Sequence, residues 1–132
     1  MNPFLVKDIV FATDLTEDQG LVLKHVKRFQ ELFKSTIHLV TINSPSNFED
    51  TKSLKKRMSD FVQKYQLKDF STNIYNSKDR EEGIINFAEE INASIIAMGT
   101  HGRTGFAHLI NGSVAEDVVN HAHRMVLTVN MG

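Results

Sequence analysis

The sequence predicts one α/β domain, an open five-stranded parallel sheet of Rossmann-like type with helices on both faces. Short apolar runs alternate with segments of helical periodicity along the whole chain, and the connections between them are short. A length of 132 residues suits one continuous core. Strict strand–helix alternation implies right-handed crossovers, and therefore a parallel sheet. We expect a single domain over residues 1–132, which could also be one half of a tandem protein.

Five short runs rich in β-branched and apolar residues are the expected strands. They are residues 8–13, 36–42, 70–75, 94–98 and 125–129. The run 94–98 is almost wholly apolar, as a strand covered on both faces should be, so we expect it to be central. The run 70–75 is polar enough to lie at an edge of the sheet.

Four segments between these runs carry apolar residues at helical spacing. Their apolar stripes are Val22, Val26, Phe29 and Phe33; Leu54, Met58, Phe61, Val62 and Tyr65; Ile84, Ile85, Ala88 and Ile91; and Val114, Val118, Val119 and Ala122. Asp79 and Glu82 form a capping pair ahead of the third stripe. Ligands of such sheets bind beyond the carboxyl ends of the strands, so the residues after the first, second and fourth strands are the expected site.

The composition excludes several classes of function. With a formal net charge of −1, the chain has no basic field that would draw it to nucleic acid or an anionic membrane. The absence of cysteine removes disulfides and thiolate chemistry, and fits a reducing compartment. No stretch approaches the roughly 18 apolar residues of a membrane span, and residues 1–8 lack the layout of a secretory signal. We expect a cytoplasmic protein with no nucleic-acid or membrane partner.

The fourth strand runs directly into a glycine-rich stretch that ends where the last helix begins. Its glycines are Gly99, Gly102, Gly105 and Gly112, and Ser113 opens the helix. Glycine allows close backbone approach, while a helix start offers unpaired N–H groups and the positive end of its dipole. The stretch therefore predicts a phosphate site. Neither G-x-x-x-x-G-K-[ST] nor G-x-G-x-x-G occurs, which disfavours a kinase-like P-loop and an ordinary dinucleotide site.

The spacing resembles that of the universal stress protein family, whose ATP-binding members carry G-x2-G-x9-G-[ST]. Gly99, Gly102, Gly112 and Ser113 meet every position of that motif. The likeness covers nearly the whole chain: residues 12–16 are similar to the family's corner after its first strand, and residues 112–116 to its last helix. Met125 replaces a frequent proline, which leaves the expected nucleotide site untouched. Thr16 replaces the usual serine at that corner, a mild change that keeps the hydroxyl.

The resemblance implies a strand order of 3-2-1-4-5 and a bound nucleotide, ATP or else AMP or ADP, with Mg²⁺ on its phosphates. It implies that Asp14 and the backbone around Thr13 and Ile42 border the adenosine. The residues implied for the phosphates are Gly102, Gly112, Ser113 and Val114, with Gly99 lining the floor. The residues alone leave a second role open for Asp14, which could equally cap the first helix.

The implied function is an ATP-binding signalling or stress-response module with an unidentified signalling partner. The alternatives are a slow ATP hydrolase and a nucleotide-free dimerisation module of the same family. The loop contains no lysine and no obvious general base, so we assign no catalytic residue. We also expect a homodimer along residues 125–129, because the implied order places this apolar run at a sheet edge.

Histidines and acidic pairs give no further site from sequence. His121 and His123 are two residues apart near a helix end and would point to different faces, so we assign no metal ligand. The acidic pairs are interpreted as solvated surface, namely Glu81-Glu82, Glu89-Glu90 and Glu116-Asp117. No serine, histidine and aspartate constellation can be assembled from the sequence alone.

Overall fold

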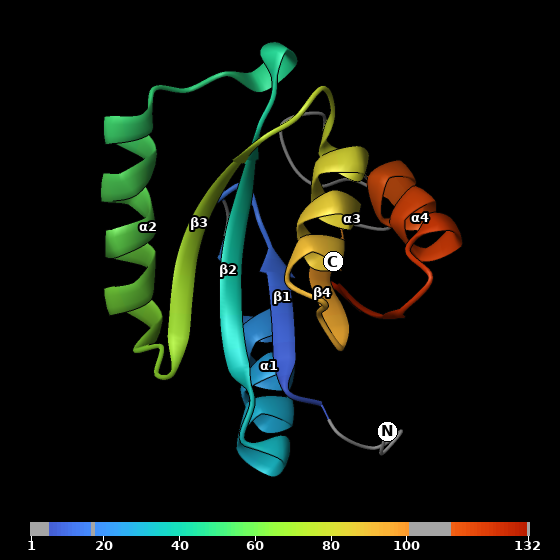
Figure 1. The fold of residues 1–132 in the computed structure, drawn as a ribbon. Helices are drawn as coiled ribbons and strands as arrows, with labels where there is room; N and C mark the ends of the chain where they lie inside the picture. Colours follow the sequence, from blue (N-terminus) through green and yellow to red (C-terminus); the bar gives the residue numbers. More distant parts are fainter. Residues whose placement is uncertain (1–5, 17, 101–111, 132) are drawn as a thin grey trace.

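A five-stranded parallel sheet runs through the middle of the computed structural model, which describes residues 6–16, 18–100 and 112–131 (Figure 1). The strands lie in the order β3-β2-β1-β4-β5. Their bounds are Asp8–Ala12 for β1, Thr36–Asn43 for β2, Phe70–Asn76 for β3, Ile95–Thr100 for β4 and Met125–Asn130 for β5. All four pairings are parallel, so the predicted fold class and strand order are confirmed.

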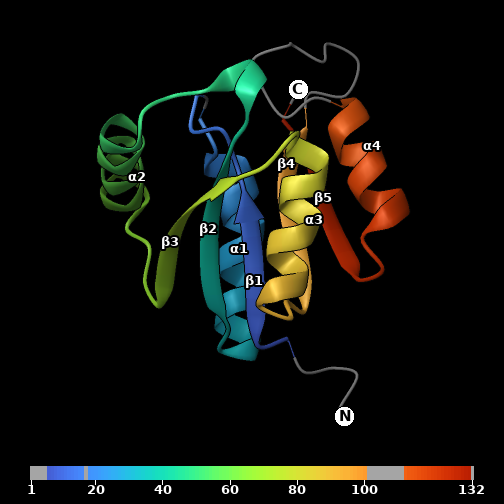
Figure 2. The same ribbon diagram turned by 45° about the horizontal axis from the view of Figure 1, so that its top comes forward.

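Two layers of helices cover the sheet. The helices are α1 over Gly20–Phe33, α2 over Thr51–Tyr65, α3 over Arg80–Glu90 and α4 over Gly112–His121, and a short 3-10 turn spans Pro45–Asn47. Apolar residues of α1 and α2 join one core, and those of α3 and α4 join the other. Figures 1 and 2 show α3 and α4 side by side on the same face of the sheet.

Alternation along the buried strands fills both cores. In β1, Ile9 and Phe11 point into the core beneath α1 and α2, while Val10 and Ala12 point into the core beneath α3 and α4. Five of the six residues of β4 are buried, as expected for a strand covered on both faces. The polar strand β3 lies at an edge, as predicted.

Helix ends follow local chemistry. Lys34 and Gln66 end α1 and α2 in the left-handed region, each with a φ of 53°, where glycine is commoner. Asp79 caps α3 as predicted, since its carboxylate accepts a hydrogen bond of 2.8 Å from the Glu82 backbone N–H. One expectation was wrong: Gly99 and Thr100 belong to β4 rather than to the loop, because they pair with Val129 and Asn130 of β5.

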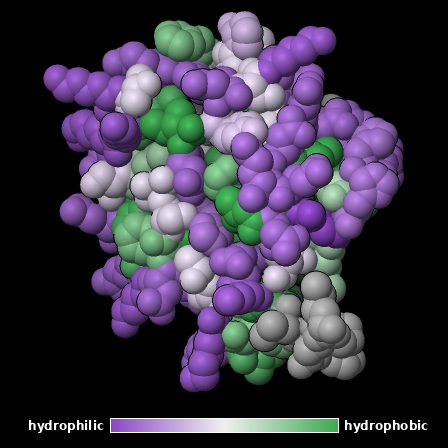
Figure 3. All heavy atoms as spheres, viewed as in Figure 1, coloured by the Kyte–Doolittle hydropathy of each residue, from purple (hydrophilic) through white to green (hydrophobic). Residues whose placement is uncertain are grey.

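The surface is mostly hydrophilic on the face that Figure 3 shows, with apolar residues in small separate groups. Within the described part of the chain, no helix has both the length and the apolar character needed to cross a membrane.

Candidate functional site

The chain makes a tight turn just beyond β1, at the carboxyl edge of the sheet. The Thr13 N–H continues the sheet pattern by donating to the Val40 carbonyl at 3.1 Å. Leu15 then adopts a φ of 66°, an unusual value for a residue with a side chain. The Thr13 hydroxyl oxygen accepts from the Leu15 N–H at 3.1 Å, and Asp14 Oδ1 accepts from the Thr16 N–H at 3.0 Å. The turn therefore holds Asp14 in one orientation.

The Asp14 carboxylate is only half used by the protein. Oδ1 accepts from both the backbone and the hydroxyl of Thr16, the latter at 2.6 Å. Oδ2 is buried and has no hydrogen-bond partner among the described residues. Among the described residues, the nearest cation is Arg80, whose Nη2 lies 4.0 Å from Oδ2, beyond hydrogen-bond length. Buried polar atoms are normally satisfied, so this oxygen is suited to accept a hydrogen bond from a ligand.

The alternative role of Asp14 as the cap of the first helix is wrong. Helix α1 begins only at Gly20, and the carboxylate beside its first N–H groups is that of Asp18. Asp18 Oδ1 accepts from the Gly20 N–H at 2.9 Å and from the Tyr65 hydroxyl at 2.8 Å. The bond from Gly20, followed by that from Tyr65, lowers the pKa of Asp18 below its ordinary value. The residue at the cap position of α1 is Gln19, whose side chain makes no capping hydrogen bond, and Asp14 lies too far ahead of the helix to cap it.

A pocket of about 410 Å³ lies beside Asp14, between the ends of β1 and β2 and the helices α2 and α3. Its lining comprises Asp14, Thr16, Thr41, Ile42, Asn43, Ser46, Glu49, Leu54, Arg57 and Arg80. Arg57 Nη2 donates to the Asp14 carbonyl at 3.1 Å, and its Nη1 contacts the Glu49 carboxylate. Glu49 also accepts from the Ser53 hydroxyl at 2.7 Å, so this carboxylate, unlike that of Asp14, has partners for both oxygens.

Ile42 is buried near the end of β2 and lines this pocket, and its predicted place beside the adenosine stays a prediction. The sequence analysis did not identify the glycine that lets helix α3 pack against Ile42. A Cβ atom on Gly83 of α3 would lie 2.7 Å from Ile42 Cγ2 and 2.9 Å from Ser77 Cβ. Helix α3 can therefore approach the end of β2 only because position 83 is glycine. A glycine within a helical stripe was the available signal.

Gly99 is explained first by packing. A Cβ atom there would lie 2.7 Å from Val22 Cγ2 of α1 and 2.7 Å from Met131 Sδ. Gly99 also lies near the carboxyl end of β4, which suits the expected role of lining the floor of a phosphate site; that role stays a prediction. Gly102 and Gly105 lie outside the described residues.

Helix α4 begins at Gly112, with Ser113 second and Val114 third, so the predicted helix start is correct to within one residue. Val114 packs against the core beneath α3 and α4. Figure 2 shows that α4 begins at the edge of the sheet where β4 ends. The positive end of the α4 dipole is therefore at the same edge as Asp14.

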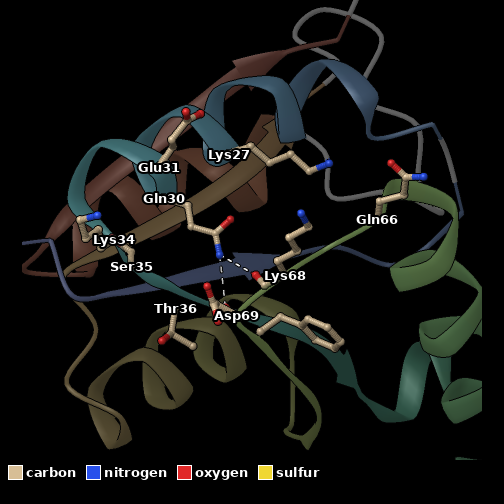
Figure 4. Close-up of a pocket in the computed structure, with 10 residues that line it drawn as sticks. Lys27, Gln30, Glu31, Lys34, Ser35, Thr36, Gln66, Lys68 and Asp69 are labelled. Carbon is tan, nitrogen blue, oxygen red and sulfur yellow. Dashed lines mark hydrogen bonds between the residues drawn. The ribbon is translucent and has the colours of Figure 1, made fainter.

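The largest of the described pockets, about 980 Å³, lies at the opposite, amino edge of the sheet. Figure 4 shows its lining of charged and amide side chains. Gln30 Nε2 donates to the carbonyls of Lys68 and Asp69, and the Lys27 ammonium donates to the carbonyl of Tyr65. These groups tie α1 to the turn before β3. Because their polar atoms are engaged by the protein, we place the candidate site at the carboxyl edge despite its smaller pocket.

A serine–histidine–aspartate chain that the sequence did not reveal crosses three strands. His38 Nδ1 lies 2.7 Å from Ser71 Oγ, and His38 Nε2 lies 2.8 Å from Asp8 Oδ1. Asn73 Nδ2 donates to Ser71 Oγ at 3.0 Å. None of these residues lines the pocket at the carboxyl edge or the cavity at the amino edge. We interpret the chain as a polar network that satisfies half-buried groups.

Comparisons with known proteins agree with this fold. The model of the universal stress protein family matches residues 6–130. Universal stress protein MJ0577 of Methanocaldococcus jannaschii is 27% identical over 159 aligned residues, which cover 95% of each chain. Universal stress protein MJ0531 of the same organism is 28% identical over 142 aligned residues, covering 95% of this chain and 82% of its own.

Solved structures of universal stress proteins share the fold of this chain. The structure of MJ0577 has a TM-score of 0.75 and 26% identity, and the match covers 97% of this chain and 98% of that one. A universal stress protein from Archaeoglobus fulgidus in complex with dAMP has a TM-score of 0.72 and 22% identity, with 96% and 99% covered. Another universal stress protein, in complex with cAMP, has a TM-score of 0.73 and 17% identity, with 97% and 99% covered. With a family match over residues 6–130 and the same fold in these relatives, the chain belongs to the universal stress protein family.

Proposed function

We propose that this chain binds an adenine nucleotide, ATP in the first place, at the carboxyl edge of its sheet and acts as a nucleotide-dependent stress-response module. The observation that carries the proposal is the buried Asp14 Oδ2, which has no hydrogen bond among the described residues and belongs to a residue that lines a pocket of about 410 Å³. The relatives in complex with dAMP and cAMP support a nucleotide as the ligand class.

The residues fit such a ligand in two parts. Beside β1 and β2, Asp14 Oδ2 would accept a hydrogen bond from a hydroxyl or amino group of the nucleoside, and Ile42 would offer apolar contact. At the start of α4, Gly112, Ser113 and Val114 would offer backbone N–H groups to the phosphates, together with Gly102 of the preceding loop. Mg²⁺, where present, would neutralise phosphate charge.

The direct test is mass spectrometry of any nucleotide released from freshly purified protein, followed by thermal shift titration of emptied protein with ATP, ADP and AMP. Ligand at about 100 times its Kd should add ~2.7 kcal/mol to the free energy of unfolding. A protein that releases no nucleotide, and whose melting temperature none of the three raises, would refute the proposal.

A variant pair locates the phosphate end of the site. Gly112→Asp places a carboxylate at the start of α4, where it would repel phosphate, so we expect binding to be lost with the fold retained. Asn120→Asp adds the same charge near the other end of the same helix and should bind ATP as the wild type does. Equal affinity in the two variants would move the phosphates away from this helix start.

A further inference from the structure

We infer a divalent transition-metal site between α3 and α4, formed by Glu81, Asp117 and His121. One potential ligand atom from each of the three lies within 4.8 Å of the other two. The site departs from the sequence expectation, which assigned no metal ligand and interpreted these carboxylates as solvated surface. It does not depend on the proposed nucleotide site.

The fold brings the three side chains together from two helices. Asp117 and His121 are four residues apart on α4, so they share one face of that helix. Glu81 lies in the first turn of α3, the neighbouring helix on the same side of the sheet (Figure 1). The sequence analysis considered His121 and His123 as a pair and so did not find the site. The partners of His121 are carboxylates, and one of them is forty positions away in the sequence.

The spacing suits a metal ion. His121 Nδ1 lies 2.9 Å from Glu81 Oε1. With metal–ligand bonds of about 2.1 Å, two ligands at a right angle are about 3 Å apart and two opposite ligands about 4.2 Å apart. The first pair already has the right-angle spacing, and a metal ion would replace the proton that the two atoms share. Small rotations of accessible side chains would bring the Asp117 carboxylate within range.

The charge balance favours a cation at this point. With a neutral imidazole, the cluster carries two negative charges from its carboxylates. In the part of the chain that the structure describes, the Glu81 carboxylate pairs only with His121, and no lysine or arginine pairs with either carboxylate. A divalent ion would neutralise both carboxylates at once.

The ligand set selects the class of metal. An imidazole nitrogen with carboxylate oxygens suits Zn²⁺, Co²⁺ and Ni²⁺, whereas Mg²⁺ and Ca²⁺ prefer sites made of oxygen alone. The His121 side chain is 62% exposed and that of Glu81 is 30% exposed, so water can complete the coordination. Bound metal would link α3 to α4 and stabilise the packing of α4 on the sheet.

The test is calorimetric titration of untagged, nucleotide-free full chain with ZnCl₂ and separately with MgCl₂, together with the visible absorption spectrum after addition of Co²⁺. We expect one Zn²⁺ per chain, a Co²⁺ spectrum of a nitrogen- and oxygen-ligated ion, and no comparable binding of Mg²⁺. His121→Ala should weaken Zn²⁺ binding at least about tenfold, since even the loss of supporting groups around a metal costs 10- to 100-fold.

His123→Ala is the matched control, because His123 is also an exposed histidine and lies two residues further along, outside the cluster. It should bind Zn²⁺ as the wild type does. Asp117→Asn, which keeps the shape of the side chain, should weaken binding as His121→Ala does, and circular dichroism will check that both variants are folded. Absence of Zn²⁺ binding by the wild type, equal affinity in the two histidine variants, or Mg²⁺ bound as tightly as Zn²⁺ would overturn the site.

Discussion

Replacement of Asp14 by asparagine separates ligand binding from the stability of the turn. The amide oxygen of the introduced asparagine can still accept from the Thr16 N–H, so the turn after β1 should persist. The amide NH₂ group then takes the position of Oδ2, the oxygen that has no hydrogen bond among the described residues. An acceptor is exchanged for a donor at the atom that we propose to contact the nucleotide. We therefore expect a loss of nucleotide affinity with little loss of stability.

The size of the effect follows from the kind of bond that is lost. A hydrogen bond to a charged group contributes about 1.5–3 kcal/mol, which corresponds to a rise of about 10- to 100-fold in Kd. The free protein loses no hydrogen bond at Oδ2, and the attraction of Arg80 acts across 4.0 Å. The free energy of unfolding without ligand should therefore change by less than about 1 kcal/mol.

Calorimetric titration with ATP measures the affinity, and chemical denaturation without nucleotide measures the stability. Asp18→Asn is the matched control, because Asp18 also accepts a backbone N–H two residues ahead but does not line the pocket. It should bind ATP as the wild type does. An Asp14→Asn protein with unchanged affinity, or an Asp18→Asn protein that is weakened equally, would refute the argument that Oδ2 contacts the ligand.

Three further predictions concern Gly83 in α3, Asp18 before α1 and Leu127 on the edge strand β5. Gly83→Ala should lower the melting temperature and weaken ATP binding. Crowding of Ile42 by the new methyl group costs about 1–3 kcal/mol, whereas the better helix propensity of alanine restores only about 1 kcal/mol. An unchanged melting temperature would show that Ile42 can move aside. Because the pKa of Asp18 is lowered in the folded protein, its carboxylate contributes stability above the ordinary value of 3.8 and loses it as the pH falls below that value. The difference in unfolding free energy between wild type and Asp18→Asn should therefore be present at neutral pH and vanish in strong acid, and a difference that is constant with pH would contradict this. Leu127→Lys on the edge strand β5 should dissociate the proposed homodimer in light-scattering measurements while ATP still binds, and a wild-type monomer at high micromolar concentration would rule the dimer out.

Much of the fold could be predicted from periodicity. The apolar runs gave the five strands and the helical stripes gave the four helices, because each element buries at least one face against a neighbour. The ends of the strands were harder to predict from the sequence, since they depend on pairing with a partner strand. Gly99 and Thr100 look like the start of a loop, yet β5 pairs with both and extends β4 through them. The secondary-structure preference of one segment does not show whether a distant segment will form backbone hydrogen bonds with it.

The candidate site could be proposed in outline from the sequence, and its details could not. The carboxyl edge, the residues beyond β1 and the start of α4 followed from the topology and from the family resemblance. The role of Asp14 could not be decided, because the sequence did not locate the residue at which α1 begins, and an aspartate directly before a helix often caps it. Gly83 was missed for a similar reason: its importance lies in the 2.7 Å that would separate its Cβ from Ile42, a distance set by how α3 crosses the sheet.

The two polar clusters that the structure revealed differ in how far a sequence could have led to them. The strand register places His38 opposite both Val10 and Ser71, and Asp8 lies two residues before Val10, on the same face of the sheet. Given the strand order and one correct pairing, alternation alone would therefore have brought these polar residues together. The cluster of Glu81, Asp117 and His121 is different. The spacing of four residues puts Asp117 and His121 on one face of α4, but their approach to Glu81 depends on the rotation of α3 and α4 about their own axes. Those rotations come from the packing of both cores, so sites between strands are easier to predict from sequence than sites between helices.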